Sequence, residues 1–147
     1  MNLSLGEIEL NGILFSNDTS IDEVFANSKF ISHFGKKGSI SIFKSEQIIV
    51  DGYKFNIKIV FINNQLDNIR MTPVNLEKKD PRYPDEKYQN EKKKVCDAFL
   101  RKHLGEPLKE SEEVVRYAFD WGSVRSIVLL SGRNEFTGGF VEIKYKR

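Results

Sequence analysis

Residues 114–145 read VVRYAFDWGSVRSIVLLSGRNEFTGGFVEIKY, and this stretch decides the fold class. It begins with apolar residues at alternate positions, which is the pattern of a strand buried on one face. The predicted inward residues of this first strand are Val115, Tyr117, Phe119 and Trp121. Gly122 reverses the chain, and the apolar run from Ser126 to Leu130 is typical of a central strand.

The end of the same stretch predicts a third strand. Gly132 to Asn134 form a turn, and alternation resumes from Thr137 to Tyr145. One face carries Val141, Ile143 and Tyr145, and the other carries Phe140, Glu142 and Lys144. We therefore expect a three-strand antiparallel meander with one apolar face and one face of mixed aromatic and charged residues.

The N-terminal half predicts short strands and one short helix. Asn11-Gly12 and Asp51-Gly52 are hairpin signals, because a type I′ turn needs positive φ angles. Ser20 followed by Glu23 fits the start of a helix, and His33 falls in the connection after it. The apolar residues between Leu3 and Phe15 predict one or two short strands. Two separate strands are expected next, with inward residues Ile40 and Ile42, then Ile48 and Val50. Residues 53–61 alternate, with Tyr53, Phe55, Ile57, Ile59 and Phe61 on one face and Lys54, Asn56 and Lys58 on the other, and a return strand ends at Thr72-Pro73.

Residues 84–104 predict the longer helix. Pro84 suits its first turn, the basic residues 101–103 suit its C-terminal end, and Gly105 provides the C-cap. The predicted buried stripe consists of Tyr88, Val95, Cys96, Phe99, Leu100 and Leu104. The residues expected to face water are Lys93, Lys94, Asp97 and Lys102.

These elements predict an α+β protein with an antiparallel sheet of about seven or eight strands and two helices. We expect a single domain over residues 1–147, because 147 residues are enough for one hydrophobic core. The alternative is two helix-plus-meander halves, 1–73 and 84–147, joined by the charged loop 74–83. A weak internal echo between Tyr53-Lys54-Phe55-Asn56 and Tyr117-Ala118-Phe119-Asp120 supports a duplication.

The amino-acid composition bears on the cellular compartment and on the class of binding partner that we expect. The net charge of +2 is too small to indicate DNA or membrane binding, although the middle of the chain is basic. The single cysteine, Cys96, rules out an internal disulfide, and the sequence shows neither a signal peptide nor an apolar run long enough to span a membrane. We expect a cytoplasmic protein, and the frequent Ile, Asn and Lys are typical of a low-GC bacterial genome.

The sequence favours no particular chemistry. His33 and His103 lack metal ligands at the usual spacing, and no nucleophile or phosphate-binding motif occurs. Cys96 is expected to be a core residue, and Lys92-Lys93-Lys94 a solvated helix face. We therefore expect no catalytic residue, no cofactor and no metal site.

One resemblance bears on function. A helix ending in Leu104-Gly105-Glu106-Pro107, followed by the strand Tyr117 to Gly122 and a meander, resembles the helix-plus-sheet units of the β-lactamase-inhibitor-protein and small outer-membrane-lipoprotein type. It also resembles small bacterial proteins that serve as immunity partners of secreted toxins. The resemblance covers about a fifth of the chain and implies a non-enzymatic, protein-binding role by fold analogy. The absence of a signal sequence departs from the exported members, so their periplasmic roles do not carry over.

We predict a protein-binding module. The more specific prediction is an immunity protein that neutralises a bacterial toxin. The predicted partner-binding residues are Arg116, Arg125, Phe140 and Glu142, because they share the face of the meander that the helix leaves free. Trp121 is expected to be partly in the core. The alternatives are a nucleic-acid-binding domain that uses the basic middle, and an enzyme whose site is assembled from distant residues.

Overall fold

The computed structural model describes residues 1–34, 40–74, 86–111, 113–128 and 139–147, and for residues 33, 34 and 86–89 it describes the backbone alone. The elements in chain order are η1 (Leu3–Leu5), β1 (Ile8–Leu10), β2 (Ile13–Phe15), α1 (Ile21–Phe25), β3 (Ile31–Phe34), β4 (Ile40–Val50), β5 (Tyr53–Ile62), β6 (Gln65–Pro73), α2 (Glu86–Leu104), β7 (Lys109–Glu110), β8 (Val114–Phe119), β9 (Gly122–Ile127) and β10 (Phe140–Tyr145).

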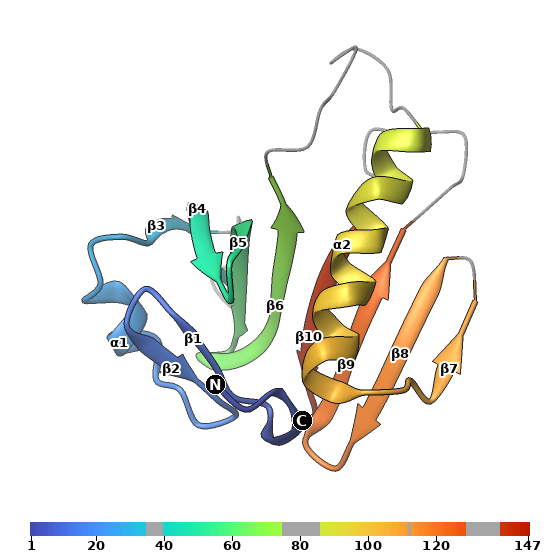
Figure 1. Ribbon diagram of the computed structural model, residues 1–147. Coiled ribbons are helices and arrows are strands. Elements are labelled where there is room, and N and C mark those ends of the chain that lie inside the picture. Colours follow the sequence, from blue (N-terminus) through green and yellow to red (C-terminus); the bar gives the residue numbers. More distant parts are fainter. Residues whose placement is uncertain (35–39, 75–85, 112, 129–138) are drawn as a thin grey trace.

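The main sheet has eight strands in the order β3-β4-β5-β6-β10-β9-β8-β7, and every described pairing in it is antiparallel. The α2 helix lies across one face of its C-terminal part, while the β1–β2 hairpin and α1 lie beside its N-terminal part (Figure 1). The predicted α+β class and the meander of β8, β9 and β10 are confirmed.

The two halves of the chain contain the same kinds of element in the same order. A helix, a short edge strand and a three-strand meander run from α1 to β6 and again from α2 to β10, and the last strands, β6 and β10, pair at the centre. In this scheme β5 corresponds to β9, whereas the sequence echo links Tyr53 in β5 to Tyr117 in β8. The topology therefore agrees with a repeated unit, but the echo aligns strands that occupy different places in it.

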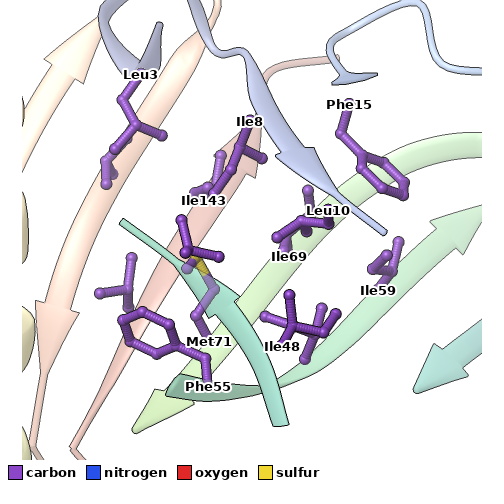
Figure 2. Packing of buried hydrophobic residues seen from close by; sticks show 14 of the residues in the cluster. Leu3, Ile8, Leu10, Phe15, Ile48, Phe55, Ile59, Ile69, Met71 and Ile143 are labelled. Atoms are coloured by element: carbon purple, nitrogen blue, oxygen red, sulfur yellow. The ribbon is translucent and has the colours of Figure 1, made fainter. Parts of the chain in front are cut away.

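One hydrophobic cluster contains side chains from both halves, so the sheet has a single buried face. Leu3, Ile8, Leu10 and Phe15 of the N-terminal segment lie against residues of the sheet such as Ile69 (Figure 2). Three residues of α2 belong to the same cluster: Cys96, Phe99 and Leu100. The residues that alternate with this core point to the opposite face of the sheet, which we call the outer face.

The β4 strand departs from the predicted pattern. It is one strand of 11 residues with an irregularity between Ser45 and Ile48, where Gln47 has a φ of 55°. Such a bulge adds a residue and exchanges the two faces, so Phe43 is buried before it and Ile48 after it. The prediction that Ile42 faces inward is therefore wrong, as it is for Ile40, and the prediction for Ile48 and Val50 is confirmed.

Three other local predictions are corrected. Residues 3–5 form a 3-10 helix rather than a strand, and residues 31–34 form the edge strand β3 rather than a connection. The middle strand of the meander begins at Gly122, because Phe119 pairs with Gly122 and leaves Asp120 and Trp121 as the turn. Of the predicted strand 126–130, residues 129 and 130 lie outside the described residues, as do the predicted turns at 35–38 and 132–134 and most of the loop 74–83.

Most of the predictions for the α2 helix are confirmed. Gly105 has a φ of 73° and its N–H donates to the carbonyl oxygen of Arg101, as a C-cap does. Cys96, Phe99 and Leu100 are fully buried. Lys93, however, is only 7% exposed and pairs with Asp97, so the prediction that it faces water is wrong.

Candidate functional site

The outer face carries a row of charged residues that crosses the sheet from β4 to β7, seven of its eight strands. Each member is the direct cross-strand partner of the next, from β4 through β5, β6, β10, β9 and β8 to β7. In order, the row is Lys44, Lys58, Arg70, Glu142, Arg125, Arg116 and Lys109. All members except Glu142 are cations, and like charges placed directly opposite each other destabilise a sheet. We call this set the cross-strand row.

The C-terminal part of the row lies in a groove. Its volume is about 450 Å³, and it is lined by Val114, Arg116, Ser123, Arg125, Glu142 and Lys144. The side chains project from β8, β9 and β10, whose short turn at Asp120 and Trp121 sets the register of the first two strands. The groove therefore contains three of the four predicted partner-binding residues.

Two of the cations in the groove are neutralised by neighbours. The Arg125 guanidinium pairs with the Glu142 carboxylate. Lys144 Nζ lies 2.5 Å from Asp67 Oδ2, where β6 has a register shift. Burial raises the pKa of Asp67, but hydrogen bonds from Lys144 and Asn68 outweigh it, so its pKa lies below the ordinary value. Arg116 is exposed and makes no ion pair within the described chain, which leaves its charge available to a ligand.

Phe140 differs from its predicted role. It follows the outer-face alternation of β10 but is only 7% exposed, and the guanidinium carbon of Arg70 lies 4.2 Å from the centre of its ring. The predicted exposed aromatic residue is therefore covered by a cation from the neighbouring strand. A cation over an aromatic face is a favourable contact, so Phe140 holds Arg70 in place rather than offering a ring to a partner.

Local sequence patterns do not predict the N-terminal members of the row as a group. The alternation of β5 placed Lys58 on the polar face, but Lys44 and Arg70 join it only through strand pairing. Lys58 is partly buried, and its pKa is lowered, first by that burial and then by the charges of Arg70 and Lys44. No ion pair to Lys44, Lys58 or Arg70 is found within the described residues.

The other candidate residues have structural contacts. His103 Nε2 lies 3.1 Å from Asp51 Oδ2, which also accepts from Lys102 at 2.7 Å, and this cluster joins the end of α2 to the β4–β5 hairpin.

Burial raises the pKa of the Cys96 thiol, which keeps it protonated. Lys92 is 7% exposed, so the expected solvated face is wrong for it as well as for Lys93. In the described part of the chain, no group of acidic, histidine or cysteine side chains is arranged to hold a metal ion.

A second hollow, of about 780 Å³, lies beside the β1–β2 turn and the β4 bulge. Its charged lining residues are Glu9, Lys29, Glu46 and Asp51, all exposed and of both signs. This lining favours no class of ligand, whereas the cross-strand row has one dominant sign.

No protein-family model, curated protein or solved structure matches this chain. Among the described helices, none has the length and apolar character needed to cross a membrane.

Proposed function

We propose that this protein is a binding module that docks an acidic surface of a partner protein into the groove on β8, β9 and β10. The observation that supports the proposal is that Arg116, Arg125 and Lys144 line a concave part of the outer face, with Arg116 and Arg125 directly opposed. Arginine is enriched at protein interfaces because its planar group pairs with carboxylates through two hydrogen bonds. Carboxylates of a partner would offset the repulsion between Arg116 and Arg125, which are direct cross-strand neighbours.

The lining of the groove favours a protein over a nucleic acid. Val114 adds a half-buried apolar wall, and Glu142 places a carboxylate where a phosphate backbone would be repelled. Single-stranded nucleic acids stack their bases on exposed aromatic rings, and the described outer face exposes none because Phe140 is covered. A mixed apolar and charged groove is the composition of a protein interface.

The specific role as an immunity protein for a bacterial toxin remains a prediction that rests on the resemblance of the helix and the meander. A cytoplasmic location belongs to the same proposal, since a single buried thiol suits a reducing compartment. A gene for a secreted toxin directly upstream would support the immunity role, and co-purification of the toxin domain with this chain would test it directly.

The docking proposal is tested by affinity capture from native cell extract with the wild-type chain and two single variants. Arg116→Glu reverses the exposed, unpaired cation of the groove, and the matched control Lys94→Glu reverses an exposed cation on α2. We expect Arg116→Glu to abolish capture of the partner while Lys94→Glu retains it. Circular dichroism must show that both variants are folded.

Two outcomes overturn the proposal. Equal capture by both folded variants eliminates the groove as the site. Loss of capture after nuclease treatment of the extract, together with a steep salt dependence, assigns the face to nucleic acid instead.

A further inference from the structure

The N-terminal part of the cross-strand row forms a second group, Lys44, Lys58 and Arg70, which we call the cation triad. The three residues occupy directly opposed positions on β4, β5 and β6. Neighbouring strands lie about 4.8 Å apart, so the triad spans roughly 10 Å across the outer face. It shares no residue with the groove on β8, β9 and β10.

The triad differs from the groove in having no counter-charge. Arg125 pairs with Glu142 and Lys144 pairs with Asp67, whereas the described chain offers no carboxylate in ion-pair contact with the triad. Glu142 is the direct cross-strand partner of Arg70, but its carboxylate is engaged by Arg125. Three opposed cations without an acid lower the stability of the sheet, and a multivalent anion placed over them would remove that cost.

Arg70 is held in place before any ligand binds. Lys58 and Arg70 are partly buried, and the Arg70 guanidinium rests on the ring of Phe140. The Arg70 Nε atom is buried and has no hydrogen-bond partner in the described chain. A planar guanidinium fixed by an aromatic ring keeps its two terminal nitrogens free for a phosphate oxygen pair, and little side-chain entropy remains to be lost on binding.

We propose that Lys44, Lys58 and Arg70 form a binding site for a condensed phosphate group. A single carboxylate has too little charge to neutralise three cations over this span, whereas a diphosphate presents several anionic oxygens within the same distance. The shared chemistry is a compact phosphoryl anion, supplied either free or as the diphosphate of a nucleotide. This inference does not depend on the proposed protein docking, because the residues of the two sites are different.

The test is isothermal titration of the full chain with sodium pyrophosphate at constant ionic strength. We expect saturable binding to the wild type and a loss of at least about tenfold in affinity for Lys58→Gln, because one charge-assisted hydrogen bond and one cation are removed. Lys94→Gln, an exposed change on α2, is the matched control and should keep the wild-type affinity within about twofold. Thermal unfolding checks that each variant is folded.

Further titrations identify the source of the phosphate group, and other results would overturn the proposal. A nucleoside diphosphate that binds more tightly than pyrophosphate, with the same dependence on Lys58, identifies the nucleotide as the source, and equal binding of both identifies the phosphate group alone. Absence of saturable pyrophosphate binding, or equal affinity of Lys58→Gln and wild type, overturns the proposal. Tighter binding of a short single-stranded oligothymidylate that Lys58→Gln abolishes also overturns it, because the site would then belong to a nucleic-acid backbone. Loss of protein capture by Arg116→Glu has no bearing on any of these results.

Discussion

The hydroxyl group of Tyr145, in the last strand, donates a hydrogen bond to the carbonyl oxygen of Gly6, 2.9 Å away and 139 positions earlier in the sequence. The Trp121 ring reinforces this contact, since its Nε1 donates to the Ser4 carbonyl oxygen at 2.9 Å and its plane stacks on Phe119 at 7°. The N-terminal segment is thereby joined to the C-terminal half of the sheet. Burial raises the pKa of Tyr145, so its hydroxyl remains protonated and able to donate.

Replacing Tyr145 with phenylalanine tests this contact. We expect Tyr145→Phe to lower the free energy of unfolding by about 1–3 kcal/mol, because the buried Gly6 carbonyl loses its donor. The matched control is Tyr53→Phe, since the Tyr53 hydroxyl has no hydrogen bond in the described chain, and its effect should stay within about 0.5 kcal/mol. Urea unfolding at neutral pH measures both. Equal effects of the two substitutions would contradict the assigned role.

Gly6 offers a second test in the same region. Its φ is +74°, and a Cβ atom there would lie 2.8 Å from Trp121 Cδ2, so Gly6→Ala must displace the indole ring. Gly12 also has a positive φ, of +83°, but has nothing within 4 Å of the same position. Both alanine variants should lose about 1–2 kcal/mol from the left-handed backbone, and Gly6→Ala should lose more.

The spectrum of Trp121 separates the two glycine variants. It is the single tryptophan of the chain, so a change in its emission maximum reports the displacement of this ring alone. We expect a shift for Gly6→Ala and none for Gly12→Ala. An unchanged emission maximum in Gly6→Ala would contradict the contact between Gly6 and Trp121.

The packing of α2 on the sheet is tested at Phe99. This residue is fully buried, and its ring centre lies 5.4 Å from that of Phe55 and 6.0 Å from that of Tyr53. Phe99→Ala should lower the free energy of unfolding by about 3–5 kcal/mol, because it leaves a cavity between helix and sheet. Lys94→Ala, on the exposed side of the same helix, should change it by less than about 0.5 kcal/mol. A loss below about 1 kcal/mol for Phe99→Ala would mean that another face of α2 meets the sheet.

Lys58 links stability to pH. Its pKa in the folded chain lies below the value of 10.5 for a free lysine, first because of burial and then because of Arg70 and Lys44. Between the folded pKa and 10.5 the unfolded chain binds more protons than the folded chain, so stability from this group rises with pH. Below the folded pKa, the charged Lys58 is a net cost.

We therefore expect Lys58→Gln to stabilise the protein at neutral pH by roughly 0.2–1 kcal/mol, the size of a cross-strand charge effect. The gain should shrink as the pH rises through the folded pKa of Lys58, because the wild-type amine then loses its charge. Urea unfolding of both proteins at neutral and alkaline pH measures the difference. Destabilisation by Lys58→Gln at neutral pH would show that repulsion among the triad cations does not lower the stability of the folded chain.

Local pattern was enough to predict several elements. The β5 strand was predicted from its alternation, with Phe55, Ile57 and Ile59 on the buried face, and the Asp51-Gly52 turn before it was predicted from its need for positive φ. The α2 helix was predicted from its periodicity and its Gly105 cap. These features depend on neighbours within a few positions, so the sequence contains the whole signal.

Two elements were mispredicted because their structure depends on distant partners. The β4 bulge exchanges the faces of that strand, and the pairing of β4 with β5 is what reveals it. The β3 strand forms on the free edge of β4, although its own sequence has no clear alternation. Strand formation there depends on hydrogen bonds to an existing edge rather than on local propensity.

The sequence by itself determined which residues are polar and which face of each regular strand they share, because side chains alternate with a period of two. Arg116, Arg125 and Glu142 were placed on one face in this way. Only the tertiary structure decided that Lys44, Lys58 and Arg70 continue the same row, since that requires β6 to pair with β10 and each strand to take one register. The register of the strands depends on burying the opposite, apolar face against α2 and the N-terminal hairpin. These contacts join residues far apart in the chain, so a short stretch of sequence does not predict them.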